Sequence, residues 1–215
     1  MLYQNILNTH QQFLLGKLDL QDADDFYLAG GTALALQIGH RTSVDFDFYS
    51  KEPFDNLELL ASLQEQISDL TVQSQEEKTL RVFSQDTEVS FFVYPYPLIR
   101  PTVQFDQLKL ASKEDIAAMK LIAIVQRGTQ RDFVDIYFLL QEFSLRELLS
   151  FATQKFAGYQ EMLFLKALVF FDDAENTVPQ SGVRVLKPDY SWQKAKAYVI
   201  AEVKKYQLEM GGLNP

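Results

Sequence analysis

Two adjacent glycines, Gly30 and Gly31, constrain the fold of this chain most strongly, because they interrupt an apolar pattern at a single point. An apolar run at residues 26–29 stops at these glycines. Thr32 then opens a short, mostly apolar segment that ends at Gly39. The pattern predicts a strand, a tight turn and a short helix in immediate succession.

The stretch after this helix, residues 44–49, alternates strictly between two kinds of side chain, with Val or Phe at every second position. Because successive side chains of a strand point to opposite faces, Asp45 and Asp47 are expected to project side by side. Two neighbouring carboxylates repel each other unless a cation lies between them. Mg²⁺ takes one or two carboxylates and completes its shell with water and phosphate oxygens. Asp45 and Asp47 are therefore candidate Mg²⁺ ligands and catalytic residues.

The glycine turn suits the other half of such a site. Glycine lets the backbone approach a ligand closely, and the free N–H groups at the start of a helix attract anions. Gly30, Gly31 and Thr32 are therefore candidate binding residues for nucleotide phosphates. Each signal has an ordinary alternative, namely a solvated sheet face for the acidic pair and a simple turn for the glycines. Their conjunction in this order and spacing favours a metal–triphosphate site.

The order of these motifs resembles the DNA-polymerase-β-type nucleotidyltransferase superfamily, in which a Gly-Gly or Gly-Ser turn precedes a strand bearing Asp-x-Asp. More closely, Gly-Gly-Thr-Ala-Leu and Gly-His-Arg-Thr-Ser-Val-Asp-Phe-Asp-Phe are similar to motifs of the AbiEii/AbiGii-type nucleotidyltransferase toxin family. The resemblance implies a nucleotidyltransferase in which Asp45 and Asp47 bind Mg²⁺ and Arg41 and Ser43 line the triphosphate channel. His40 is interpreted as a structural histidine.

The composition indicates a globular protein of 215 residues, with 47% hydrophobic and 13% aromatic residues. The absence of cysteine excludes disulfides, thiolate zinc sites and a cysteine nucleophile. No apolar run approaches the ~18 residues of a membrane span, so we expect a cytoplasmic protein without membrane contact. The net charge of −9 argues against a generic nucleic-acid coat protein. The acidic cluster at Asp22, Asp24 and Asp25 lacks the pattern of a calcium loop and is expected to be solvated.

The rest of the first half predicts a mixed sheet. Residues 2–16 and 57–67 carry apolar side chains at helical spacing, and an N-cap is expected at Asp55 or Asn56 before the second helix. Short alternating runs at residues 70–74, 79–83 and 88–94 are separated by polar turns. They are interpreted as consecutive antiparallel strands. A doubly wound parallel sheet is therefore not expected.

The last of these strands raises the question of a third carboxylate. Polymerase-β-type enzymes usually add one from a neighbouring strand, and the position expected to carry it is Ser90. Period-two alternation places Glu88 on the same face, so Glu88 substitutes if the register slides by one pair. The alternative is that Glu88 is only a charged residue at the strand edge.

The string Tyr94-Pro95-Tyr96-Pro97-Leu98 follows this strand, and its two prolines are expected to end strand pairing. The string is similar to one that follows the third strand in many AbiEii-type proteins. We favour a rigid loop whose tyrosines cover the core. The alternative is nucleobase stacking by Tyr94 or Tyr96.

The second half is predicted to be helical. Helices are expected from Ser112 to Gly128, from about Gln130 to Leu140, and over residues 145–156, 159–171 and 192–210. Residues 172–176 are interpreted as an exposed acidic stretch. The lysines of residues 192–210 are interpreted mainly as a solvated face, with contact to an RNA backbone as the alternative.

The first two of these helices carry two cations and two carboxylates. In one interpretation Lys120 and Arg127 form exposed ion pairs with Asp132 and Asp135, each contributing only ~0–1 kcal/mol. In the other, Lys120 contacts the nucleotide phosphates and Asp135, or Asp132, orients it. The string from Lys120 to Tyr137 looks like the Lys…Arg-Asp-x-x-Asp-Leu motif of the AbiEii family, which favours the second interpretation.

We therefore expect an α+β protein with a polymerase-β-like nucleotidyltransferase domain at residues 1–110, built on a mixed sheet, and a C-terminal helical domain at 111–215. The active site is expected in the cleft between them. The resemblance implies transfer of a nucleoside monophosphate (NMP) from a nucleoside triphosphate (NTP) to a hydroxyl of RNA, such as tRNA, or of a protein. It also implies a toxin-like role with a cognate antitoxin. The alternatives are a catalytically impaired nucleotide-binding module and a small-molecule nucleotidyltransferase.

Overall fold

The computed structural model describes residues 2–20, 26–176 and 182–212. The acidic cluster at residues 22–25 lies outside these described residues. The chain divides into two compact units. Unit 1 comprises Met1–Ser112 with Gly182–Leu186, and unit 2 comprises Lys113–Ser181 with Lys187–Pro215.

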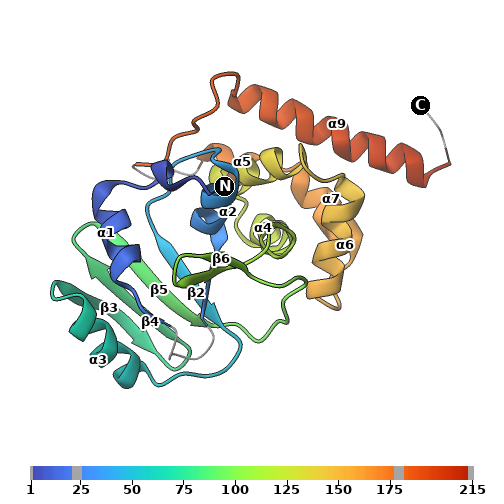
Figure 1. The fold of residues 1–215 in the computed structure, drawn as a ribbon. Helices are drawn as coiled ribbons and strands as arrows, with labels where there is room; N and C mark the ends of the chain where they lie inside the picture. The colour runs from blue at the N-terminus through green and yellow to red at the C-terminus, as the bar shows by residue number, and fades with distance from the viewer. Residues whose placement is uncertain (1, 21–25, 177–181, 213–215) are drawn as a thin grey trace. The chain divides into compact units, whose positions relative to one another are not determined.

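Unit 1 contains the sheet, as the blue to green ribbon of Figure 1 shows. Its helical segments are η1 (Gln4–Ile6), α1 (Thr9–Lys17), α2 (Gly30–Ile38) and α3 (Asn56–Gln66). Its strands are β1 (Tyr27–Ala29), β2 (Phe46–Ser50), β3 (Leu70–Glu76), β4 (Thr79–Ser84), β5 (Thr87–Val93), β6 (Val103–Phe105) and β7 (Leu108–Leu110).

The strands of the described residues form one sheet in the order β3-β4-β5-β2-β1-β7-β6. β2 pairs with β5 and β1 pairs with β7 in parallel, whereas the other neighbouring pairs are antiparallel. The sheet is therefore mixed, as the sequence predicts. β6 and β7 were not predicted from the sequence, because three residues are too few to display an alternation.

One face of this sheet carries the core of unit 1. Phe46, Phe48 and Phe91 are completely buried, and the rings of Phe48 and Phe91 stack with centroids 5.3 Å apart. Phe26 contacts Phe91 edge-on at 5.2 Å. Burying each such ring contributes ~1.5–3 kcal/mol. The opposite face, which carries Asp47, is therefore fixed in its orientation by the packing of the phenylalanines.

The N-terminal segment departs from the single helix expected over residues 2–16. A short 3₁₀ turn, η1, precedes α1, and Asn8 separates them. The Gln11 backbone N–H donates to Asn8 Oδ1 at 2.8 Å, and the Asn8 N–H donates to Gln11 Oε1 at 2.9 Å. This reciprocal cap starts a new helix at Thr9.

Unit 2 is helical in its described residues and consists of α4 (Lys113–Gln126), α5 (Gln130–Leu139), α6 (Leu145–Lys155), α7 (Glu161–Leu168), α8 (Asp172–Asn176) and α9 (Trp192–Met210). The acidic stretch at residues 172–176, expected to be exposed, forms α8 and buries Ala174. The helix expected over 159–171 is shorter and ends at Leu168. Lys196 of α9 contacts Glu175 and the rings of Phe171 and Trp192, so it does not belong to a purely solvated face.

Candidate active site

The Gly-Gly turn joins β1 to α2 without an intervening loop, because β1 ends at Ala29 and α2 begins at Gly30. Gly30 has φ +66°, a left-handed conformation that favours glycine. A Cβ atom at Gly30 would lie 3.1 Å from Asp47 Oδ2. The missing side chain therefore lets the Asp47 carboxylate lie directly against the start of α2.

Asp47 is the second residue of β2, and Asp45 directly precedes the strand, since β2 begins at Phe46. The strand was expected to start at Val44, so that expectation is wrong by two residues. The predicted alternation holds within the strand, where Phe46 and Phe48 are buried while Asp47 and Tyr49 are partly exposed.

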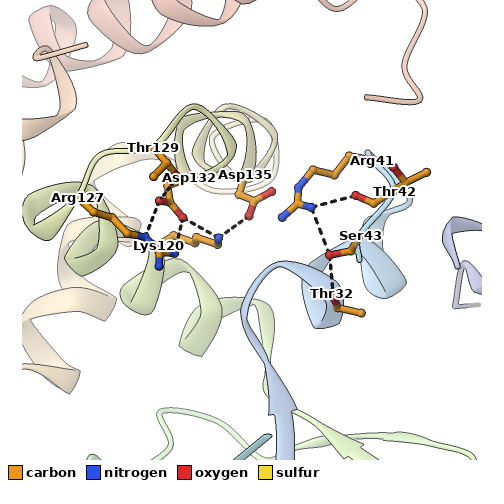
Figure 2. Close-up of polar contacts among 9 residues, drawn as sticks. All are labelled: Thr32, Arg41, Thr42, Ser43, Lys120, Arg127, Thr129, Asp132 and Asp135. Atoms are coloured by element: carbon orange, nitrogen blue, oxygen red, sulfur yellow. Dashed lines mark hydrogen bonds and ion pairs between the residues drawn. The ribbon is translucent and has the colours of Figure 1, made fainter. Parts of the chain in front are cut away.

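Thr32 of α2 ties the glycine turn to the segment that carries Asp45. Its hydroxyl donates to the Asp45 backbone carbonyl and lies 2.7 Å from Ser43 Oγ. These contacts, drawn in part in Figure 2, hold the Gly-Gly turn and the acidic pair together within unit 1.

Arg41 supplies a buried cation beside the same turn, with only 2% of its surface exposed. Arg41 Nη1 donates to the Thr42 carbonyl at 3.0 Å and to Ser43 Oγ at 3.4 Å (Figure 2). Any Cβ atom at Gly31 would collide with the Arg41 guanidinium. Glycine at position 31 therefore lets a guanidinium lie on the backbone of the first turn of α2.

The loop that carries Arg41 is held by a segment far away in the sequence. The Thr42 N–H donates to the Arg184 carbonyl at 2.9 Å, and the Leu186 N–H donates to the His40 carbonyl at 2.8 Å. The Thr42 hydroxyl also donates to the Gly182 carbonyl at 2.7 Å. His40 is fully buried, in line with its interpretation as a structural residue. Residues 182–186 thus complete unit 1, which no local sequence signal indicated.

The position expected to carry a third carboxylate is Ser90, and in the register of the sheet Ser90 of β5 lies opposite Asp47. The Ser90 hydroxyl donates to Glu88 Oε1 at 3.0 Å, and the same Glu88 oxygen lies 3.8 Å from Arg81 Nε. Within the described residues, no group of three or more acidic or histidine side chains is arranged to hold a metal ion. The Glu88 carboxylate thus contacts Ser90 and Arg81.

The remaining site candidates form a charged cluster between α4 and α5 of unit 2. Lys120 Nζ lies 2.9 Å from Asp132 Oδ1 and 2.7 Å from Asp135 Oδ2. Both carboxylates are fully buried and the Lys120 side chain is 7% exposed. The ion pairs of the first interpretation are therefore present, but those of Lys120 are buried and not exposed, because the packing of α4 on α5 encloses its ammonium group.

Asp132 receives further hydrogen bonds, as Figure 2 shows. Arg127 donates to both of its oxygens at 3.1 and 3.2 Å, and the Thr129 hydroxyl donates at 2.6 Å. Burial of Asp132 raises its pKa, but the charge of Lys120 and the bonds from Arg127 and Thr129 outweigh burial and hold the pKa well below its usual value. Asp132 is therefore ionised in the folded protein. Thr129 was missed in the sequence, where a threonine before a helix indicates only a cap.

Comparison with known proteins decides the family. The family model for "Nucleotidyl transferase AbiEii toxin, Type IV TA system" matches residues 12–191. The chain belongs to the AbiEii family. It is a nucleotidyltransferase, and membership implies a nucleotide substrate and an antitoxin partner. An uncharacterised protein of Aquifex aeolicus (strain VF5) is 34% identical over 189 residues, covering 85% of this chain and 88% of the relative.

Solved structures share the fold of this AbiEii-family chain. A proposed nucleotidyltransferase from H. pylori matches with a TM-score of 0.64 at 18% identity, covering 99% of each chain. MenT4, a nucleotidyltransferase toxin from Mycobacterium tuberculosis H37Rv, matches with a TM-score of 0.58 at 19% identity, covering 90% of this chain and 81% of MenT4. Both support the α+β nucleotidyltransferase fold. Among the described residues, no helix combines the length and the apolar character needed to cross a membrane.

Proposed function

We propose that this AbiEii-family protein transfers an NMP from an NTP to a hydroxyl group of RNA, such as tRNA, or of a protein, in a Mg²⁺-dependent reaction. The observation that carries the proposal is the position of the Asp47 carboxylate against the Gly-Gly turn. A group that binds metal and a backbone that binds phosphate thereby share one small volume. We assign this chemistry to a nucleotidyltransferase domain at residues 1–110, followed by a helical domain at 111–215.

The triphosphate is proposed to bind at the N-terminus of α2. The first N–H groups of a helix have no partner within the helix and carry partial positive charge, so Gly30, Gly31 and Thr32 offer donors to phosphate oxygens. Arg41, held by Ser43 next to Gly31, adds a full positive charge that rigidly faces the same turn. This position supports the predicted roles of Arg41 and Ser43 in binding the triphosphate.

The two carboxylates fit a divalent ion. Nucleotidyltransferases generally use a divalent metal ion, and Mg²⁺ accepts one or two carboxylates together with phosphate oxygens. Asp45 and Asp47 would hold it, and it would withdraw charge from the phosphate that is attacked. This donor set has oxygen atoms only, which suits Mg²⁺.

The reaction forms one bond and breaks one bond. The acceptor hydroxyl oxygen bonds to the α-phosphorus, the α–β phosphoanhydride bond breaks, and pyrophosphate leaves, while the hydroxyl proton passes to water. Positioning and charge neutralisation dominate such a transfer. Lys120 is proposed to steady the charge that develops on the phosphates, with Asp135 and Asp132 orienting its ammonium group.

One observation favours a second candidate, a nucleotide-binding module without catalytic power. Ser90 lies opposite Asp47, at the position where the polymerase-β pattern places a third carboxylate. Without that carboxylate, deprotonation of the acceptor lacks its usual base. Ser90→Asp discriminates between the candidates, because it accelerates transfer by an active enzyme and creates transfer in an impaired module.

The test compares two labels of the same NTP with Mg²⁺ and total RNA, tRNA or protein as acceptors. Transfer of an NMP carries the α-³²P label to the acceptor and leaves the γ-³²P label in pyrophosphate. We expect Asp47→Asn to abolish α-label transfer without unfolding the chain. Asp106→Asn, the same change at an exposed turn residue, serves as the matched control. Failure of the wild-type protein to label any acceptor from all four NTPs refutes the proposal.

A further inference from the structure

Residues 182–186, which we call the strap, pair with the loop that carries Arg41 although Gly182 and Thr42 are 140 positions apart in the sequence. The chain leaves unit 2 to form the strap and returns to unit 2 directly after it. An antiparallel bridge joins Val185 of the strap to Arg41, and a backbone hydrogen bond lies on either side of this bridge. The strap is therefore a part of unit 1 whose contacts converge on the Arg41 loop.

The Thr42 side chain bonds to the strap in both directions. Its hydroxyl donates to the Gly182 carbonyl at 2.7 Å and accepts the Arg184 backbone N–H at 2.9 Å. A hydroxyl has one proton to donate, so the donation to Gly182 uses it completely. The Thr42 backbone N–H adds a third bond, to the Arg184 carbonyl at 2.9 Å. Thr42 is thus fixed to the strap through its side chain and its backbone.

The carbonyl of the same Thr42 holds the Arg41 guanidinium. Arg41 Nη1 donates to this carbonyl at 3.0 Å, as Figure 2 shows. The guanidinium lies on the backbone of Gly31, where any Cβ atom would collide with it. A long arginine side chain has many rotamers, and a fixed acceptor restricts them. The strap therefore acts on the direction of the guanidinium through Thr42.

The neighbours of Thr42 show how closely the loop is held. Gly182 has φ +81°, and a Cβ atom there would lie 2.8 Å from Val44 Cγ1, so the strap packs directly on Val44. Between Thr42 and Val44, the Ser43 carbonyl accepts a hydrogen bond from the buried Gln11 side chain of α1 at 2.9 Å. Helix α1 and the strap thus hold successive residues of the Arg41 loop.

We propose that the strap positions the Arg41 guanidinium for the triphosphate and that Thr42 is the positioning residue through which it acts. This inference rests on the proposed function, in which Arg41 binds the phosphates. Gly182 and Arg184 of the strap are exposed, so a buried cation is held by hydrogen bonds that water can reach. Contacts of this kind open at a low free energy. Breaking them leaves the charge of Arg41 in place and loosens its orientation.

Titration calorimetry on the full chain with inorganic triphosphate and Mg²⁺ tests the strap. This probe has no base and no sugar, so it reports the phosphate contacts alone. Thr42→Val keeps the shape of the side chain and removes the hydroxyl. We expect it to weaken binding by roughly 3- to 10-fold, the range for loss of a neutral hydrogen bond. Thr42→Ser keeps the hydroxyl and serves as the matched control.

A double-mutant cycle shows whether Thr42 acts through Arg41. Arg41→Lys keeps the positive charge and removes the fork that reaches the Thr42 carbonyl. In the Arg41→Lys background, Thr42→Val should weaken binding no further, whereas independent effects would add. A merely structural role of Thr42 would lower the melting temperature and would not produce this coupling.

Gly182→Ala tests the strap from its other side. Its Cβ atom collides with the stiff, β-branched Val44 side chain, so we expect the strap to be displaced and triphosphate binding to weaken as in Thr42→Val. Gly212→Ala is the matched control. Gly212 has a similar φ of +69°, but its Cβ atom would meet no described atom within 4 Å. Thermal melts confirm that each variant is folded.

Three outcomes overturn the strap. The first is wild-type affinity for triphosphate in folded Thr42→Val. The second is equal weakening by Thr42→Val in the wild-type and Arg41→Lys backgrounds, and the third is an equal loss of affinity in Gly182→Ala and Gly212→Ala. Each leaves the proposed function intact when transfer of the α-label persists. Triphosphate binding that weakens in Thr42→Val, in a protein that transfers no label, refutes the proposed function and supports the strap.

Discussion

Lys120 and Lys155 are both buried lysines of unit 2 that pair with aspartates, and α4 contributes one partner to each cluster. Lys155 of α6 contacts Asp115 of α4 at 2.8 Å, and both side chains are completely buried. Lys120 of α4 contacts two carboxylates, keeps 7% of its side chain exposed, and shares Asp132 with Arg127.

The comparison shows that burial of a lysine does not by itself indicate catalysis. A sealed pair such as Lys155–Asp115 can only fix the packing of α6 on α4, because neither charge reaches solvent. The Lys120 cluster includes Arg127, whose side chain is 55% exposed, so one of its cations reaches solvent. We therefore assign Lys155 to stability and propose Lys120 for function.

The largest expected effect is on stability and comes from Lys155→Met. Losing the Lys155 ammonium group removes a fully buried salt bridge to Asp115, so the free energy of unfolding should fall by about 3–5 kcal/mol. Chemical denaturation followed by circular dichroism measures this change, while kcat per folded molecule stays at the wild-type value. The double variant Asp115→Leu with Lys155→Met should regain most of the loss, since it buries no charge. A loss of kcat in a folded Lys155→Met protein would contradict the assignment.

Lys120→Arg should lower kcat by roughly 10²–10³-fold, as expected for loss of a positioned donor at a site of developing charge. Arginine keeps the positive charge beside Asp132 and Asp135, so the fold is retained while the ammonium group is displaced. Steady-state transfer of α-label and a thermal melt of the same sample separate the two effects. Lys113→Arg, a matched change at a partly exposed lysine of α4, should leave kcat unaltered. A wild-type kcat in the Lys120→Arg variant would show that Lys120, like Lys155, has only a structural role.

Acid should destabilise the Lys120 cluster through Asp132. The folded pKa of Asp132 lies below its ordinary value of 3.8, so the unfolded chain takes up this proton first as the pH falls. The stabilisation of the fold by ionised Asp132 is therefore complete above about pH 4. It is lost as the pH falls further towards the pKa of Asp132 in the folded protein. Urea denaturation should show that the free energy of unfolding falls more between pH 5 and pH 3 for the wild-type protein than for Asp132→Asn. An equal fall in the free energy of unfolding of both proteins would mean that Asp132 is not the group that titrates.

The smallest expected effect is that of Arg127→Gln. Its side chain is largely exposed, so its ion pair with Asp132 should contribute at most about 1 kcal/mol and weaken in high salt. Thermal melts at low and high salt measure this contribution. A loss above 2 kcal/mol would show that the Lys120 cluster is as sealed as the Lys155 pair.

The sequence predicted the parts of the fold that depend on local pattern. The turn at Gly30, the helix end at Gly39 and the inward face of β2 follow from residue types within a few positions. Long-range packing was not predictable in the same way. The pairing of residues 182–186 with the Arg41 loop joins positions about 140 apart. The enclosure of Asp132 and Asp135 likewise depends on how α4 packs against α5.

In the candidate site, too, the local features were predictable from the sequence and the long-range contacts were not. The convergence of Asp47 on the glycine turn was predicted because a strand–turn–helix unit and the next strand bring these residues together. The contact of Glu88 with Arg81 was not predicted, because it depends on the register of β4 and β5. The roles of Lys120 and Asp135 stay a prediction.

Titration calorimetry with a non-hydrolysable NTP analogue tests most directly whether the Gly-Gly turn and the acidic pair form one metal–triphosphate site. We predict that Mg²⁺ strengthens binding by the wild-type protein by at least tenfold and that Asp47→Asn removes this gain, while Asp106→Asn keeps it. Binding that is equally tight with and without Mg²⁺, and that survives Asp47→Asn, would show that the Gly-Gly turn and the acidic pair do not form a metal–triphosphate site.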